Sequence, residues 1–288
     1  MPNILKTENK MMIDEEENQN KIIIEIKNNS QEVNKRISKD DISTQEKLTQ
    51  LLMSENSEIL KFFEINEFLD SGSESLVYKI INKITQKTYC VKIIINKANG
   101  KRNIKEFDII KKLKYDNIIN CYLIDKIKKD EIDCIIMEYG KLGHIKSFMK
   151  NILKMKCLSE SLLCFFSYQI LKGLKYCHKN KICHYDIKPY NIIIDDYLKV
   201  KIIDFSISID YSIINTNKIK LPVLGTNFYM APEVIESIII NKEDLNKIDL
   251  YSLGVTLYNL AFGIYPFDLN QEDLKDYGKI YYKKKIIN

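Results

Sequence analysis

The sequence contains no tryptophan and only 5 prolines and 9 glycines among its 288 residues. Collagen-like repeats and low-complexity linkers need far more glycine and proline. Since 45% of the residues are hydrophobic, the chain can bury a sizeable core, which excludes a wholly disordered protein. The length fits one large domain or two small ones.

Long apolar runs are also missing. No run approaches the roughly 18 apolar residues of a membrane-spanning helix, and the longest candidate, GVTLYNLAFGIYPF, is typical of a buried helix. The N-terminal segment MPNILKTENK lacks the apolar core of a secretory signal, and seven cysteines, an odd number, fit reduced thiols. We therefore expect a cytoplasmic protein without a membrane span, and the same features fit a nuclear one.

The net charge of +5 is unevenly distributed. Residues 1–60 hold 8 Lys and Arg against 12 Asp and Glu, whereas the rest of the chain holds 36 against 27. A mildly basic globular part favours acidic surfaces or substrates. Because the sequence has no dense basic stripe with interleaved aromatic residues, we expect no nucleic-acid partner.

The chain divides into two parts of different composition. Residues 1–61 are polar, and we expect a largely disordered N-terminal extension with a short helix at 45–60. The segments FFEINEFL, SLVYKIIN and TYCVKIII that follow are β-rich and predict an antiparallel meander. One helical pattern, NIKEFDIIKKLK, comes after this meander, and beyond residue 143 most of the pattern is helical. This order predicts an α+β fold of two lobes with a cleft between them.

The segment HYDIKPYNIII, residues 184–194, carries most of the chemical information. KIIDFS follows, with Asp204 18 residues after Asp186, and then GTNFYMAPEV, with Glu233 29 residues after Asp204. With these motifs in this order and at this spacing, residues 62–288 resemble a eukaryotic protein kinase domain. The resemblance implies a bilobal kinase fold with ATP and Mg²⁺ as cofactors. Its small lobe would span about 62–140 and its large lobe about 141–288.

Transfer of the γ-phosphoryl group of ATP needs positioning and charge neutralisation more than covalent help. By the resemblance, Asp186 accepts or orients the proton of the substrate hydroxyl, and Lys188 neutralises charge on the phosphoryl group. Asn191 and Asp204 hold Mg²⁺, which prefers oxygen ligands. Apart from the resemblance, these residues would form a polar turn between two Ile-rich strands.

In the small lobe, YCVKII resembles the strand that carries the phosphate-binding lysine, here Lys92. Glu106 lies 14 residues later on the expected helix and matches the ion-pair partner of that lysine. Taken alone, a lysine on a strand and a glutamate on a helix are ordinary surface residues. By the resemblance, Val77 and Cys90 cover one face of the adenine, Ile193 covers the other, and the backbone of residues 138–140 bonds its edge. Met137 is at the gatekeeper position. The full set of nucleotide-binding residues that the resemblance implies is Leu69, Gly72, Val77, Cys90, Lys92, Met137, Glu138, Tyr139 and Ile193.

The loop LDSGSESLVYK matches the glycine-rich loop of the family poorly. Only the middle glycine, Gly72, is present, and Asp70 and Ser75 occupy the outer glycine positions. Close approach of backbone N–H groups to phosphate favours residues without Cβ, and Asp70 places a carboxylate near a polyanion. We therefore expect weaker ATP binding than in kinases with the full motif.

Two departures from the family pattern concern activation. Kinases usually carry an arginine before the catalytic aspartate, which binds a phosphorylated activation loop; here the residue is Tyr185. The segment IKLPVL before Gly225 has no Ser or Thr at the usual phosphorylation position. We predict that activity does not depend on phosphorylation at the usual activation-loop site, so phosphatase treatment should cause no loss of activity through this segment. A large loss of activity that mass spectrometry traces to phosphate on residues 204–233 would contradict this prediction.

Other positions bear on the substrate and on the metal loop. Lys188 and Thr226 match kinases that phosphorylate Ser and Thr, and Thr226 is expected to bond Asp186 and Lys188. Ser206 replaces the glycine that normally ends the metal-binding motif, and we expect it to stiffen this loop. A separate cluster with the spacing Cys-His…Cys-His does not match a zinc finger, and we expect no zinc there. It comprises Cys177, His178, Cys183 and His184.

The large lobe is C-terminally curtailed relative to the family. After DLYSLGVTLYNLAFGIYPF, in which Asp249 should anchor the catalytic loop, only one more helix-like stretch follows. The family has further helices, including an arginine that pairs with the glutamate corresponding to Glu233. We expect one side of the central helix to be exposed, and a partner to cover it.

Three functions follow from these observations. The first is an active Ser/Thr protein kinase whose protein substrate offers a Ser or Thr acceptor. It is supported by six residues that are all present, namely Lys92, Glu106, Asp186, Lys188, Asn191 and Asp204. A pseudokinase-like nucleotide-binding or scaffold module is supported by the altered glycine loop, Ser206 and the short C-terminus. A small-molecule phosphotransferase shares an Asp and an Asn at similar spacing, but it does not explain Pro189 together with GTNFYMAPE.

Overall fold

The computed structural model describes residues 61–71, 75–95, 105–127 and 132–267. The expected extension, but for its last residue, and its helix at 45–60 lie outside the described residues, as do Gly72 and the stretch beyond residue 267.

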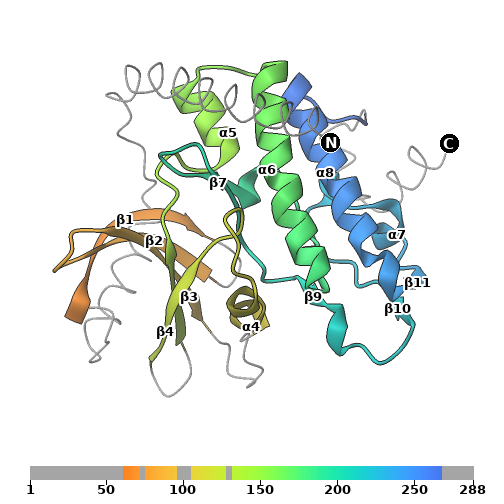
Figure 1. Ribbon diagram of the computed structural model, residues 1–288, viewed down its shortest axis with the longest axis horizontal. Helices are drawn as coiled ribbons and strands as arrows, with labels where there is room; N and C mark the ends of the chain where they lie inside the picture. The colour runs from red at the N-terminus through yellow and green to blue at the C-terminus, as the bar shows by residue number, and fades with distance from the viewer. Residues whose placement is uncertain (1–60, 72–74, 96–104, 128–131, 268–288) are drawn as a thin grey trace, which may run out of the picture.

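One antiparallel sheet of five strands, in the order β1-β2-β3-β5-β4, forms the small lobe (Figure 1). The strands are β1 (Phe63–Ser71), β2 (Ser75–Asn82), β3 (Thr88–Ile95), β4 (Cys121–Ile127) and β5 (Ile132–Glu138). The helix α4 (Lys105–Lys112) packs on one face of this sheet, because its Ile109 and Ile110 share a core with Met137. The expected β lobe with one helix is confirmed.

The register of the sheet assigns the expected nucleotide residues to one face. Val77 pairs with Lys92, and Cys90 pairs with Met137. Since side chains alternate along a strand, Cys90 and Lys92 point the same way, together with these two partners. The opposite face has its own core of Tyr78, Ile80, Val91, Ile93, Cys134 and Ile136.

The large lobe is built on two long helices, α6 (Glu160–Lys179) and α8 (Leu245–Phe262), which lie side by side in Figure 1. Shorter helices are α5 (Ile145–Ser147) and α7 (Pro232–Ile235). Short strands form three pairs. These are β6 (Ile182–Cys183) with β9 (Ile209–Asp210), β7 (Ile192–Ile194) with β8 (Val200–Ile202), and β10 (Lys218–Lys220) with β11 (Ile239–Asn241).

The sequence explains where the two long helices begin, end and pack. Ser159 caps α6 by accepting a hydrogen bond from the N–H of Leu162 at 3.4 Å. Buried residues then recur every four positions. They are Leu162, Phe166, Ile170 and Leu174. Helix α8 ends at Gly263, whose φ of 74° is a left-handed conformation that suits glycine.

Three large apolar side chains of α8 are exposed. Leu250 and Phe262 are 48% and 61% exposed, and Tyr258 is also exposed, whereas Leu245, Ile248, Leu253, Val255 and Leu260 are buried. Within the described ranges, none of the helices combines the length and apolarity of a membrane span.

Candidate active site

The segment between β6 and β7 is fixed in place by a buried carboxylate on α8. Asp249, with no exposed surface, accepts hydrogen bonds from the backbone N–H groups of His184 at 2.9 Å and Tyr185 at 2.8 Å. His178 of α6 donates a third bond at 2.7 Å. Tyr185 has a φ of 72°, a rare conformation for a residue with Cβ. Three anchors on Asp249 therefore determine the direction in which the next residue, Asp186, points.

Asp186 lies at the centre of a dense polar network. Its Oδ2 accepts hydrogen bonds from Lys188 Nζ at 2.6 Å and from Asn191 Nδ2 at 2.9 Å. Its Oδ1 accepts bonds from the hydroxyl and the backbone N–H of Thr226, at 2.8 and 3.1 Å. Lys188 also donates to Thr226 Oγ1 at 2.8 Å. The structure thus brings together four residues that the sequence places up to 40 positions apart.

The ring of His184 contacts both the segment around Asp186 and the segment around Asp204. Its Nε2 lies 2.8 Å from the carbonyl oxygen of Ile203, and its Nδ1 lies 3.3 Å from the backbone N–H of Asp186. A carbonyl oxygen only accepts, so Nε2 carries the proton and Nδ1 is the acceptor. The ring also contacts Phe205 edge-on. The imidazole is therefore a structural bridge between the two predicted metal-binding segments.

A second cluster joins the two lobes. Lys92 Nζ on β3 donates to both carboxylate oxygens of Glu106, at 2.9 and 2.8 Å, and to Asp204 Oδ1 at 2.9 Å. Lys92 and Glu106 are buried, whereas the side chain of Asp204 is about one-third exposed. One cation therefore connects the sheet, α4 and the large lobe.

The charges in this cluster stabilise one another. Burial alone would lower the pKa of Lys92, but the carboxylates of Glu106 and Asp204 outweigh it and hold this pKa above its ordinary value. Burial alone would raise the pKa of Asp204, but the charge of Lys92 together with hydrogen bonds from Lys92 and Ser206 outweighs burial and lowers this pKa to about 2. Lys92 is thus a cation and Asp204 an anion throughout the neutral range.

The residues expected to contact the adenine ring come from both lobes. Val77, Cys90 and Met137 come from the sheet face described above, and Ile193 comes from β7 of the large lobe. Gly140 approaches Ile193 so closely that a Cβ would lie 2.8 Å from its Cδ1. Leu69 lies within a bulge of β1, between the paired residues Phe68 and Asp70.

Two residues between the lobes offer oxygen ligands for a metal. Asn191 donates from Nδ2 to the carbonyl oxygen of Asp186 at 2.8 Å as well as to its carboxylate, so its own amide oxygen points elsewhere. Asp204 has a φ of 65°, and its carboxylate is held ionised by Lys92. A carboxylate and an amide oxygen suit a hard cation such as Mg²⁺.

An ion pair between Lys201 and Glu138, which joins the two lobes, was not predicted from the sequence. Lys201 of β8 lies 3.0 Å from Glu138, and both side chains are largely buried. The same carboxylate accepts bonds from the backbone N–H of Asn120 at 2.8 Å and from its Nδ2 at 3.2 Å. A lysine in an otherwise apolar strand indicates a buried charge that needs a partner, but the sequence does not identify Glu138, which is 63 positions away.

The four residues of the Cys-His cluster have other contacts. His178 and His184 bond Asp249 and Ile203, and the thiol of Cys183 donates to the carbonyl oxygen of Leu245 at 3.1 Å. All seven cysteines of the chain are free thiols.

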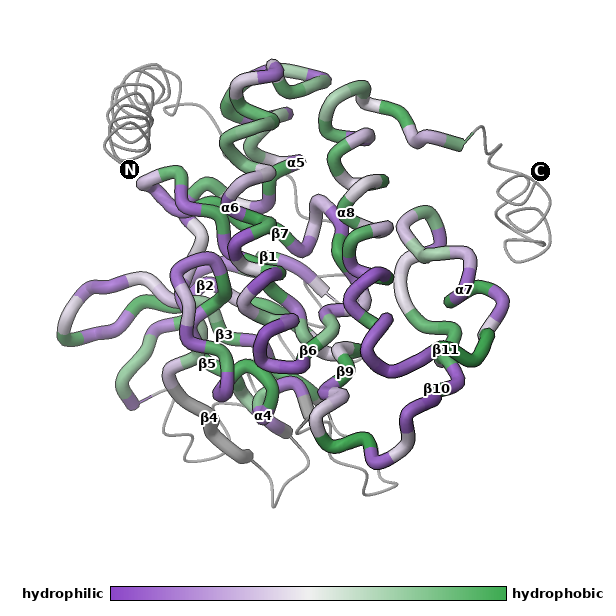
Figure 2. The backbone as a smooth tube through the Cα atoms, turned by 45° about the vertical axis from the view of Figure 1, so that its right-hand side comes forward, coloured by the Kyte–Doolittle hydropathy of each residue, from purple (hydrophilic) through white to green (hydrophobic). Residues whose placement is uncertain are grey.

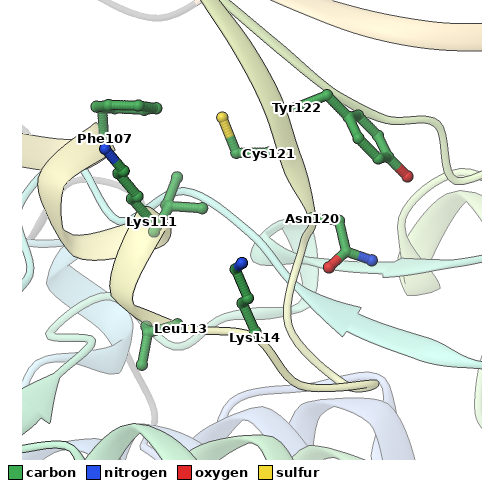
Figure 3. A pocket seen from close by; sticks show the side chains of 8 residues that line it. Phe107, Lys111, Leu113, Lys114, Asn120, Cys121 and Tyr122 are labelled. Carbon is green, nitrogen blue, oxygen red and sulfur yellow. The ribbon is translucent and has the colours of Figure 1, made fainter.

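A hollow of about 400 Å³ lies between α4 and β4 (Figure 3). Its walls contain none of the residues that the sequence assigns to catalysis, nucleotide or metal. It is lined by Phe107, Ile110, Lys111, Leu113, Lys114, Asn120, Cys121 and Tyr122.

Comparison with known proteins agrees with this geometry. The family model of the protein kinase domain matches residues 63–287. The chain is 32% identical over 213 residues to serine/threonine-protein kinase TIO of Arabidopsis thaliana, and 34% identical over 199 residues to serine/threonine-protein kinase 4 homolog B of Dictyostelium discoideum. These matches cover 72% and 69% of this chain but 15% and 17% of those relatives. Mitogen-activated protein kinase kinase 7 of Arabidopsis thaliana is 32% identical over 204 residues, with 69% and 63% covered.

The small antiparallel lobe, the helical lobe and the Asp–Lys–Asn–Thr cluster of the large lobe agree with the match to this family model. The chain belongs to the eukaryotic protein kinase family, and its relatives are of the serine/threonine type.

Proposed function

We propose that the protein is an active kinase that transfers the γ-phosphoryl group of Mg-ATP to a Ser or Thr hydroxyl of a protein substrate. The observation that carries this proposal is the network around Asp186, in which Lys188, Asn191 and Thr226 all lie within hydrogen-bond distance. An ordinary polar turn does not require hydrogen bonds between a threonine up to 40 positions away in the sequence and both Asp186 and Lys188.

Each residue of this network has a defined task. The carboxylate of Asp186 accepts or orients the proton of the attacking hydroxyl, and the ammonium of Lys188 neutralises charge on the phosphoryl group. Thr226 holds both side chains in register. Its position beside Asp186 also supports a Ser or Thr acceptor, as the sequence motif indicates.

The cofactors follow from the remaining groups. Lys92, held by Glu106, would bind the α- and β-phosphates of ATP, and Asn191 and Asp204 would hold Mg²⁺. A bound Mg²⁺ neutralises phosphate charge. The adenine would lie between Val77 and Cys90 on one side and Ile193 on the other, and would bond the backbone of residues 138–140.

The compartment and partners are proposed from the surface and the thiols. Seven free cysteines support a reducing compartment such as the cytoplasm. The exposed Leu250, Tyr258 and Phe262 on α8 support a partner that covers this end of the large lobe. The carboxylate of Glu233 has no ion pair within the described ranges, which is consistent with a missing cationic neighbour.

A pseudokinase-like module is the second candidate. It is favoured by Asp70 and Ser75 at the positions where phosphate-binding loops carry glycine. Phosphate transfer from labelled ATP with Mg²⁺ to a generic protein substrate separates the two functions, and phosphoamino-acid analysis tests Ser and Thr against Tyr. Well-folded protein without transfer, but with an ATP-induced rise in its melting temperature, would support the second candidate.

Asp70 is expected to weaken ATP binding. It is exposed on β1, and a carboxylate near a triphosphate costs about 1 kcal/mol in a solvent-exposed setting. Asp70→Asn should therefore tighten ATP binding about 5-fold, and Asp70→Gly should tighten it further because it also removes Cβ. Isothermal titration with Mg-ATP measures both.

Glu64→Gln is the matched control, because it removes the same charge from an exposed position near the other end of β1. Equal affinities for wild type and both Asp70 variants would show that this carboxylate does not oppose nucleotide binding.

A further inference from the structure

The activation segment, residues 204–233, is attached to the large lobe by its own backbone. β10 within this segment pairs with β11, and the register is Lys218 with Asn241, Ile219 with Ile240, and Lys220 with Ile239. Figures 1 and 2 both show the two strands beside each other at the edge of the lobe. A strand pair of this kind supplies hydrogen bonds that need no modification of a side chain.

Further bonds extend the pairing in both directions. On one side, Lys242 donates from its backbone N–H to Asn217 at 2.9 Å and from Nζ to the carbonyl oxygen of Ile214 at 3.0 Å. On the other side, the N–H of Leu221 donates to Ile238 at 3.1 Å, and Ser237 Oγ donates to the carbonyl oxygen of Leu221 at 2.6 Å. The attachment thus continues to residue 221.

Tyr185 provides the next attachment point. Its hydroxyl donates to the carbonyl oxygen of Pro222 at 2.9 Å, and its ring is only 3% exposed. The ring packs in a core that also contains Leu221 and Met230. Thr226, whose hydroxyl donates to Asp186 at 2.8 Å, lies four residues after Pro222.

The surroundings of Tyr185 do not suit a phosphate group. Burial raises the pKa of the phenol, and the nearby Cys183 and the carboxylates of Glu233 and Asp249 raise this pKa further. The chain has only two arginines, Arg36 and Arg102, so the large lobe contains none of the side chains that bind phosphate in a bidentate manner.

We propose that Tyr185 is a positioning residue which, together with the β10–β11 pair, holds residues 217–226 in the conformation that places Thr226 against Asp186. This role rests on the proposed kinase function, and it assigns to a hydroxyl and a strand pair the task for which other kinases use a phosphorylated loop.

The test is Tyr185→Phe, which removes the hydroxyl and keeps the ring. The matched control is Tyr211→Phe, because Tyr211 is equally buried in the same core but donates to His178 at 3.1 Å. Loss of one buried hydrogen bond should speed amide exchange of residues 217–226 about 5- to 10-fold, whereas Tyr211→Phe should leave exchange there unchanged. Hydrogen–deuterium exchange with mass spectrometry measures this on the full chain without substrate.

Kinetics provide the second measurement. Tyr185→Phe should lower kcat/KM for a protein substrate by a similar factor and leave the KM for ATP unchanged, since Lys92 and the adenine pocket are not altered. Ser237→Ala, which removes the bond to Leu221, should also speed exchange of residues 217–226. Ser237→Ala therefore replaces Tyr185→Phe as the test if the tyrosine variant does not fold.

The two proposals fail in different ways. Unchanged exchange in a folded Tyr185→Phe variant, or equal acceleration in Tyr211→Phe, would overturn the role of Tyr185. If Tyr185→Phe does not fold, unchanged exchange in Ser237→Ala would overturn the attachment of this segment. A wild-type protein without any phosphate transfer would instead overturn the catalytic function, and the exchange result would still decide whether Tyr185 holds the segment.

Discussion

Asp186→Asn is expected to lower phosphate transfer by at least about 1,000-fold, the upper part of the range for loss of a general base. The variant also disturbs its neighbours. Asp186 Oδ2 accepts hydrogen bonds from Lys188 Nζ and Asn191 Nδ2. If the amide nitrogen of asparagine took this place, its N–H₂ group would face these two donors, and no hydrogen bond could form. If the amide turned over, its N–H₂ group would instead face the backbone N–H of Thr226.

The assay compares wild type and variant with labelled ATP, Mg²⁺ and a protein substrate. Asp195→Asn is the control, because Asp195 of the same lobe also accepts backbone N–H groups, from Tyr197 and Lys199, outside the candidate site. Its activity should match that of wild type. An ATP-dependent rise in the melting temperature of the Asp186 variant would show that it still binds nucleotide and that its pocket is intact. Transfer above about a tenth of the wild-type rate would contradict the assigned role.

The second large effect is expected on stability. Asp249→Asn should lower the free energy of unfolding by about 3 kcal/mol, because either orientation of the amide leaves a buried N–H group without an acceptor. Oδ1 receives the N–H of Tyr185, while Oδ2 receives His178 and the N–H of His184. Chemical denaturation measures the change. Asp244→Asn, at a partly exposed position just before α8, should change stability little.

This effect depends on pH in a defined direction. Burial alone would raise the pKa of Asp249, but the hydrogen bonds and electrostatic interactions with His178 and His184 together outweigh burial and hold this pKa below its ordinary value. The stabilisation is therefore present above the ordinary aspartate pKa of about 4 and is lost as the pH falls through the lower folded-state value. The stability difference between wild type and Asp249→Asn should narrow in acid. A constant difference from pH 7 to pH 3 would rule out the ionised carboxylate as the source.

Much of the fold could be predicted because it depends on local patterns. The alternation in TYCVKIII predicts a strand with Cys90 and Lys92 on one face, and the spacing of buried residues in SESLLCFFSYQILKGL predicts a helix. The order and spacing of HYDIKPYN, DFS and APE were sufficient to predict the family and the residues of the candidate site. The identities of Asp186, Lys188, Asn191 and Asp204 required no coordinates.

The amino-acid sequence by itself thus determined the family and the two-lobed order of elements, and it proposed the side chains of the candidate site. The tertiary structure decided which of them meet. Lys92 reaches Asp204 112 positions away, Lys201 reaches Glu138, and Tyr185 reaches Pro222. The pairing of β10 with β11 also joins two segments whose sequences give no sign of each other. The physical reason is that side-chain periodicity reports only the local backbone and the buried face, whereas a hydrogen bond or ion pair forms only where folding brings distant atoms within about 3 Å.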